Sequence, residues 1–193
     1  KYKPLTDLVT EKKVINIVSN YLQSLPILLS ASVWLTKFSD KKPDSSQLYH
    51  FDREDSYQLK VFIPLEPIKE TAGPLCLLSA KQSSEFIRNN LKRFKLISLK
   101  DRIDDSEVLK NIKDPLEYKQ VANPGELIFA DTTNCLHYGS RFSKTLKYHL
   151  SLQYVSPFSV KLSKFLTFVK KNNLEKNKLD VLSYFQWKYN NPI

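Results

Sequence analysis

The 193-residue chain is poor in residues that characterise several common classes of protein. Its two cysteines, Cys76 and Cys135, have no paired spacing, which argues against a disulfide framework or a zinc knuckle. We therefore expect free thiols in a reducing compartment. Methionine is absent even at the first position. Completeness of the chain thus stays open, and short contiguous motifs carry more weight than long spacings.

Long apolar runs are also lacking. A membrane helix needs about 20 apolar residues, and the longest candidate, Leu25 to Leu35, is short and contains Pro26. A polar Thr-Glu-Lys-Lys stretch at 10–13 follows too soon for a signal peptide. We therefore expect a cytoplasmic protein that does not enter a membrane.

The residues present indicate a globular protein, because 41% of the chain is apolar. The net charge is +10, and the segment 161–193 contributes seven lysines against Glu175 and Asp180. Those lysines alternate with apolar residues at helical spacing, which is typical of a solvent-facing helix; an anion-binding surface is the alternative. Recognition motifs for nucleic acid are missing, so we do not expect that partner.

Periodicity predicts a helix near 10–25, with Thr10 as its N-cap, followed by a strand at 27–38 and a polar loop at 39–46. The helix carries an apolar stripe of Val14, Ile17, Val18, Tyr21 and Leu22. Short strands punctuated by Gly and Pro are expected at 47–51, 57–65, 75–78, 126–130, 135–138 and 147–155. The charged segment 81–119 is predicted to be helix plus loop.

This order indicates a mainly β fold with flanking helices, either an antiparallel sandwich or a barrel. We predict a single domain over 1–193. It comprises an N-terminal part of helix and strand at 1–45, a β core at 46–156 and a basic helical tail at 157–193.

Two of the three histidines have informative positions. His50 and Asp52 are two residues apart, so on an extended strand both side chains point to one face and can reach one ion. His137 follows much later. Two histidines and one carboxylate suit Fe(II), because they leave three coordination positions open. Alone, the His-X-Asp pattern is weak, since a single strand histidine is more often structural or exposed.

The surroundings strengthen that interpretation. Over residues 45–156 the chain resembles the phytanoyl-CoA dioxygenase-like family of Fe(II)- and 2-oxoglutarate-dependent oxygenases. The resemblance implies a double-stranded β-helix, that is, a jelly-roll or cupin-like barrel, with His50, Asp52 and His137 as iron ligands. The blocks that carry it are His50-Phe51-Asp52, Leu59 to Leu65, Glu70 to Ala80, Pro124 to Thr132 and His137 to Arg141, which together hold all three glycines.

The resemblance also implies a cation for the distal carboxylate of 2-oxoglutarate, and that position, ten residues after His137, is Lys147. Arg141 is the rival anchor, or else a structural or substrate contact. Lys60, Phe62 and Gln47 are further expected co-substrate contacts, although Phe62 is equally suited to the core. His149 is expected to contact substrate or co-substrate.

On the strand that carries Lys147, polar and apolar residues alternate. We predict that the polar set faces the barrel interior and the apolar set packs under the helices. An exposed edge strand is the alternative. The polar set is Lys147, His149, Ser151 and Gln153, and the apolar set is Tyr148, Leu150 and Leu152.

These features predict a dioxygenase that uses Fe(II), 2-oxoglutarate and O₂ to hydroxylate a small organic substrate, with release of succinate and CO₂. The positive charge mildly favours an anionic substrate. The intact Asp52 favours hydroxylation over halogenation. A non-catalytic jelly-roll binding protein, or an oxygenase of nucleic acid or protein, is the alternative. The substrate and the oligomeric state stay open.

Overall fold

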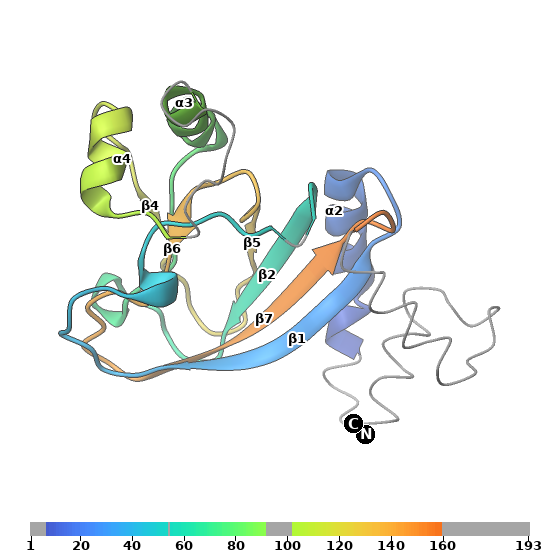
Figure 1. Ribbon diagram of the computed structural model, residues 1–193. Coiled ribbons are helices and arrows are strands. Elements are labelled where there is room, and N and C mark those ends of the chain that lie inside the picture. The colour runs from blue at the N-terminus through green and yellow to red at the C-terminus, as the bar shows by residue number, and fades with distance from the viewer. Residues whose placement is uncertain (1–6, 54, 92–101, 160–193) are drawn as a thin grey trace, which may run out of the picture.

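A computed structural model describes residues 7–53, 55–91 and 102–159 (Figure 1). The predicted tail helix lies almost wholly outside the described residues. The helices are α2 (Lys12–Leu22), α3 (Ala80–Leu91) and α4 (Asp105–Asn111), with short 3₁₀ turns η1 (Ser45–Gln47) and η2 (Glu70–Ala72). The strands are β1 (Ile27–Thr36), β2 (Gln58–Pro64), β3 (Cys76–Leu77), β4 (Tyr118–Lys119), β5 (Ile128–Ala130), β6 (His137–Tyr138) and β7 (Lys147–Val155).

The strands form two antiparallel sheets, which lie on opposite sides of the molecule's centre in Figure 1. The larger sheet has the order β1-β7-β2-β5 and the smaller one β4-β3-β6. His50 makes a β-bridge to His137, which places the segment around His50 beside β6. Most successive segments along the chain then belong to alternate sheets. This winding is the double-stranded β-helix, so the predicted fold class is confirmed.

Helix α2 covers the outer face of the larger sheet (Figure 1). Its buried residues are Val14, Val18 and Leu22, and they belong to one apolar core with residues of β2 and β7. From β7 this core receives Leu150, Leu152 and Tyr154. The predicted apolar face of β7 therefore packs under the helix over most of its length, while Tyr148 is 39% exposed.

Strand β7 lies between β1 and β2, so the exposed-edge alternative is wrong. Lys147, His149, Ser151 and Gln153 line an internal cavity, as the alternation predicted. The period of two along a pleated strand explains both faces, because successive side chains point to opposite sides.

A second apolar core lies under α3 and α4 and supports the smaller sheet. It includes Phe86 of α3, Val108 of α4 and Leu136, the residue before β6. Leu136 is fully buried, and its backbone N–H donates to Ser83 Oγ at 2.8 Å. The two helices therefore fix the strand that carries His137.

Several local predictions were wrong. The N-cap of α2 is Glu11 and not Thr10, and Ile17 and Tyr21 of the predicted stripe are exposed at 47% and 39%. No regular strand forms at 47–51. Tyr49 pairs with Ile103 and His50 pairs with His137, so each pairing is an isolated bridge to a different segment. Strand β4 was missed, since both of its residues are exposed and give no alternation.

In the described part of the chain, none of the helices combines the length and the apolarity that a bilayer crossing requires. The cytoplasmic location stays a prediction.

Leu152→Ala tests the core between α2 and the larger sheet. Leu152 is fully buried, so its truncation should lower the free energy of unfolding by about 2–5 kcal/mol. Urea unfolding followed by circular dichroism measures this. Leu109→Ala is the matched control, because Leu109 is 62% exposed on α4; its change should stay within about 0.5 kcal/mol. Equal losses in the two variants would contradict the assigned core.

Candidate metal site and cavity

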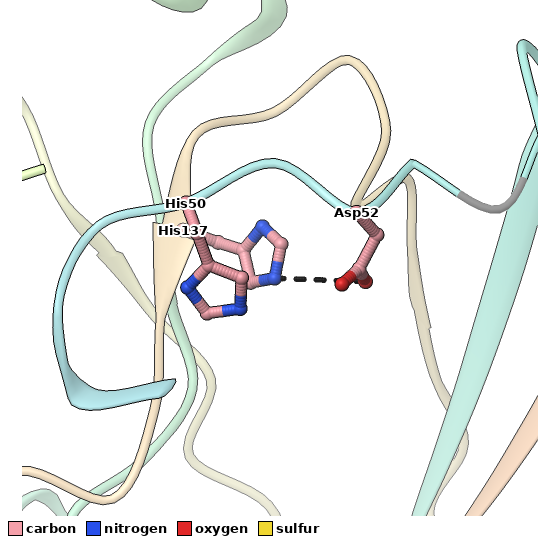
Figure 2. Close-up of side chains that lie close together, drawn as sticks. All are labelled: His50, Asp52 and His137. Carbon is pink, nitrogen blue, oxygen red and sulfur yellow. Dashed lines mark ion pairs between the residues drawn. The ribbon is translucent and has the colours of Figure 1, made fainter. Parts of the chain in front are cut away.

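His50, Asp52 and His137 converge on one point (Figure 2). The backbone holds them there: His50 N–H donates to His137 O at 2.9 Å, and His137 N–H donates to His50 O at 3.1 Å. Asp52 N–H donates to Thr132 O at 2.9 Å, and this bond fixes the backbone at Asp52, two residues after His50. One potential ligand atom from each of the three side chains lies within 4.8 Å of the others.

Both imidazoles are held in the same tautomer. The Nδ1 atom of His50 lies 2.8 Å from Leu48 O, and that of His137 lies 2.9 Å from Cys135 O. A carbonyl oxygen only accepts hydrogen bonds, so each Nδ1 carries the proton. Each Nε2 therefore keeps a lone pair. Such backbone partners are the usual way in which proteins orient metal-binding histidines.

The electrostatics also favour metal binding. Burial lowers the pKa of His137 to about 4, against the opposing effect of Asp52, and burial likewise lowers the pKa of His50. Metal ligands must be deprotonated, and these imidazoles are neutral at pH 7. Burial acts to raise the pKa of Asp52, but Lys60 and His137 outweigh it and the net shift is downward.

Two neutral imidazoles and one carboxylate therefore form a donor set that fits Fe(II) and leaves positions for other ligands. His137 Nε2 lies 3.7 Å from Asp52 Oδ2, the contact marked in Figure 2. That oxygen also receives the Lys60 ammonium at 2.6 Å. The structure thus places Lys60 on a candidate metal ligand.

A cavity of about 660 Å³ opens beside the three residues. This volume lies in the range of small-molecule sites. Its wall includes His50, Asp52 and His137 together with Lys147 and His149 of β7. Phe62 and Gln47 also line it. The structure therefore brings most of the residues singled out in the sequence to one cavity.

Lys147 is 3% exposed, and its ammonium donates to Gly73 O. Burial lowers its pKa to about 8. His149 lies next along the same face, with its ring 5.8 Å from that of Phe62. Burial, assisted by the charge of Lys147, lowers the pKa of His149 to about 4. At pH 7 this wall thus carries one buried cation and one neutral imidazole.

Arg141 is engaged elsewhere. Its Nε donates to Gln47 O, its two terminal nitrogens contact Asp105 at 2.9 and 2.8 Å, and its guanidinium lies 3.5 Å from the centre of the Tyr138 ring. It does not belong to the wall of the cavity. These contacts tie α4 to β6.

Both polar atoms of the Gln47 side-chain amide make hydrogen bonds within the protein. Its Nε2 donates to Ser140 O at 2.8 Å, and its Oε1 accepts from Asp44 N–H at 3.2 Å. Its amide therefore braces the cavity wall, although it was expected to contact the co-substrate.

Sequence reasoning missed a buried polar chain behind Asp52. Gln153 Nε2 donates to Gln58 Oε1 at 2.8 Å, and Gln58 Nε2 donates to Thr132 Oγ1 at 3.1 Å. Gln58 and Thr132 are fully buried. The inward alternation of β7 predicted Gln153, but no sequence signal connects it to Gln58 or Thr132.

No protein-family model matches the chain, and no curated protein matches it in sequence. Solved structures do match it. SnoK, a non-haem α-ketoglutarate-dependent carbocyclase from nogalamycin biosynthesis, has a TM-score of 0.57 at 13% identity, covering 84% of this chain and 64% of its own. HygX from Streptomyces hygroscopicus has a TM-score of 0.54 at 13% identity, covering 80% of this chain and 67% of its own. HygX is also known with nickel and 2-oxoglutarate bound, matching at a TM-score of 0.51, 13% identity, 78% of this chain and 64% of its own.

The chain spans only 32% of another match, EvdMO1, and about two-thirds or less of SnoK and HygX. At these identities the likeness shows the fold. The chain thus shares the double-stranded β-helix of 2-oxoglutarate-dependent non-haem iron enzymes, as the sequence resemblance predicted.

Gly73→Ala tests how the cavity wall is built. Gly73 has φ +61°, and an added Cβ would lie 2.9 Å from Arg141 O. The substitution should cost about 1–3 kcal/mol of stability through backbone strain and should displace the carbonyl that accepts from Lys147. Thermal unfolding measures the loss. Gly139→Ala is the control, since nothing lies within 4 Å of its added Cβ. A loss as large in Gly139→Ala would contradict this packing.

Proposed function

We propose that this chain is the β-helix core of an Fe(II)- and 2-oxoglutarate-dependent oxygenase that hydroxylates a small organic molecule. The observation that carries the proposal is the convergence of two Nε2 lone pairs and one carboxylate on the wall of a cavity of ligand size. The nickel and 2-oxoglutarate found in HygX, a protein of the same fold, support it.

In this proposal His50, Asp52 and His137 hold the iron. Bound iron would supply open coordination positions for the keto acid and for O₂, and O₂ would be the oxidant for C–H hydroxylation while the keto acid is oxidised to succinate and CO₂. The protein's own task is geometric. The paired backbones of His50 and His137 fix the two imidazoles, the carbonyls of Leu48 and Cys135 fix their tautomers, and the buried walls limit the access of water.

Lys147 is our proposed anchor for the distal carboxylate of 2-oxoglutarate. It is a buried cation on the cavity wall, where an anion would repay its desolvation. Arg141 is less suited, because Asp105 and Tyr138 already occupy its guanidinium. His149, the next inward-facing residue on β7, and Phe62, whose ring lies 5.8 Å from that of His149, are proposed to contact the co-substrate or the substrate.

The substrate is proposed to combine an apolar body with an anionic group. Trp34 and Phe38 line the cavity while 58% and 63% exposed, which suits contact with an apolar ligand surface. Lys37, which lies between them in the sequence, also lines the cavity. Loss of succinate formation from a screened metabolite pool after Trp34→Ala would identify this wall as the substrate side.

The metal triad is tested by anaerobic titration with Fe(II) and 2-oxoglutarate. Wild type should develop a weak visible charge-transfer band, and His137→Ala and Asp52→Ala should lose it, because each removes one of three protein ligands. Lys119→Met serves as control, since Lys119 pairs with Glu70 at the surface. If folded wild type gives no band, the chain is a binding module and the proposed oxygenase function fails.

The anchoring role of Lys147 predicts a pH dependence. The pKa of Lys147 is about 8, so the free protein loses this cation as pH rises past 8, while the co-substrate stays dianionic. Affinity of Mn(II)-loaded protein for 2-oxoglutarate should therefore fall by up to about tenfold per pH unit above 8, as proton linkage requires.

Lys147→Arg should abolish that dependence, because arginine stays protonated, and Lys147→Met should bind weakly at every pH. Isothermal titration calorimetry from pH 7 to 9 measures all three proteins. Parallel pH profiles for wild type and Lys147→Arg would reject Lys147 as the anchor.

A further inference from the structure

The contact between Lys60 and Asp52 is the least expected feature of the site. Lys60 lies on β2, where its Cα is paired with those of Gln153 and Ala130. Its side chain is 21% exposed, and that of Asp52 is 13% exposed. The ammonium lies 2.6 Å from Asp52 Oδ2. Because both groups are largely shielded from solvent, removing one partner without a replacement is unfavourable.

The same carboxylate oxygen faces the histidines. Asp52 Oδ2 lies 3.7 Å from His137 Nε2, so the lysine holds the oxygen that is best placed to reach a metal shared with His137. A divalent ion there would lie within a few ångströms of the ammonium. Two cations at that separation repel each other strongly in a partly buried site.

We propose that the Lys60 ammonium pairs with Asp52 while the site holds no metal ion. When the metal ion binds, Asp52 exchanges the ammonium for that ion. This rests on the proposed metal site. The Asp52 carboxylate would then pair with the metal ion instead of with Lys60. The Lys60 ammonium would lose its counter-ion while it remains on the cavity wall. A sheltered ammonium without a counter-ion is unfavourable. The dianionic keto acid that enters next supplies one, so Lys60 couples metal binding to co-substrate binding.

This account predicts opposite changes from one substitution. Lys60→Met should bind Mn(II) about tenfold or more tightly than wild type, because the competing cation is gone. The Mn(II)-loaded variant should bind 2-oxoglutarate about tenfold or more weakly, because the released ammonium is gone. A merely structural role for Lys60 would weaken both. Lys119→Met removes the same charge from the surface ion pair with Glu70 and should change neither affinity.

The experiment is calorimetric titration at pH 7 under argon, first with Mn(II) and then with 2-oxoglutarate at saturating Mn(II). Lys60→Gln repeats the test with a polar side chain, and circular dichroism confirms that each variant is folded. Equal or weaker Mn(II) affinity in folded Lys60→Met and Lys60→Gln overturns the exchange. Unchanged 2-oxoglutarate affinity overturns the coupling. Failure of wild type itself to bind Mn(II) overturns the proposed function, and is therefore distinct from both.

Discussion

The pairing of His50 with His137 is the contact on which the rest of the site depends. Two backbone hydrogen bonds, of 2.9 and 3.1 Å, join segments that are far apart in the sequence. The pairing is a single bridge and not a ladder, although His137 also pairs with Leu77 of β3 on its other side. Its support comes from the apolar core beneath α3 and α4, where Leu136 and Tyr138 flank His137. Packing on one side of the smaller sheet thereby sets the positions of two imidazoles on the other.

Several polar side chains are buried in the interior of the fold, and their burial has a free-energy cost that marks this region as a candidate functional site. Lys147, Gln58 and Thr132 are buried between the sheets, although apolar residues would fill the same space more cheaply. The protein limits the cost by pairing: Gln58 with Gln153 and Thr132, Lys147 with Gly73 O, and Lys60 with Asp52. Buried groups with perturbed pKa values cluster at functional sites, and Lys147 and His149 on this cavity are such groups.

Much of this could be read from the sequence because the informative patterns are local. The two-residue spacing of His50 and Asp52, and the alternation along β7, depend only on the pleat of an extended chain. Both features place side chains around the same cavity in the structure. The order of short strands predicted an antiparallel sandwich or barrel, and the resemblance to a known family supplied the double-stranded β-helix and its distal histidine.

The sequence could not predict side-chain contacts and strand pairings that depend on the tertiary structure. Arg141 was predicted to be either a rival anchor or a structural or substrate contact, and its contact with Asp105 depends on α4, a helix whose position no local pattern predicts. Lys60 was expected at the co-substrate and lies on Asp52. Strand β4 has no buried face to mark it. In each case the neighbour is set by how the chain folds and not by a regular spacing along it, so propensity and periodicity carry no information about it.

The central claim is that two histidines and one aspartate share a metal ion at the cavity wall. The most direct measurement is an anomalous-scattering map from crystals of the protein grown anaerobically with Mn(II). We predict one peak roughly 2.0–2.3 Å from the Nε2 atoms of His50 and His137 and from a carboxylate oxygen of Asp52, a typical metal–ligand range. A map without metal at these atoms, or with the metal held by other residues, would contradict the account.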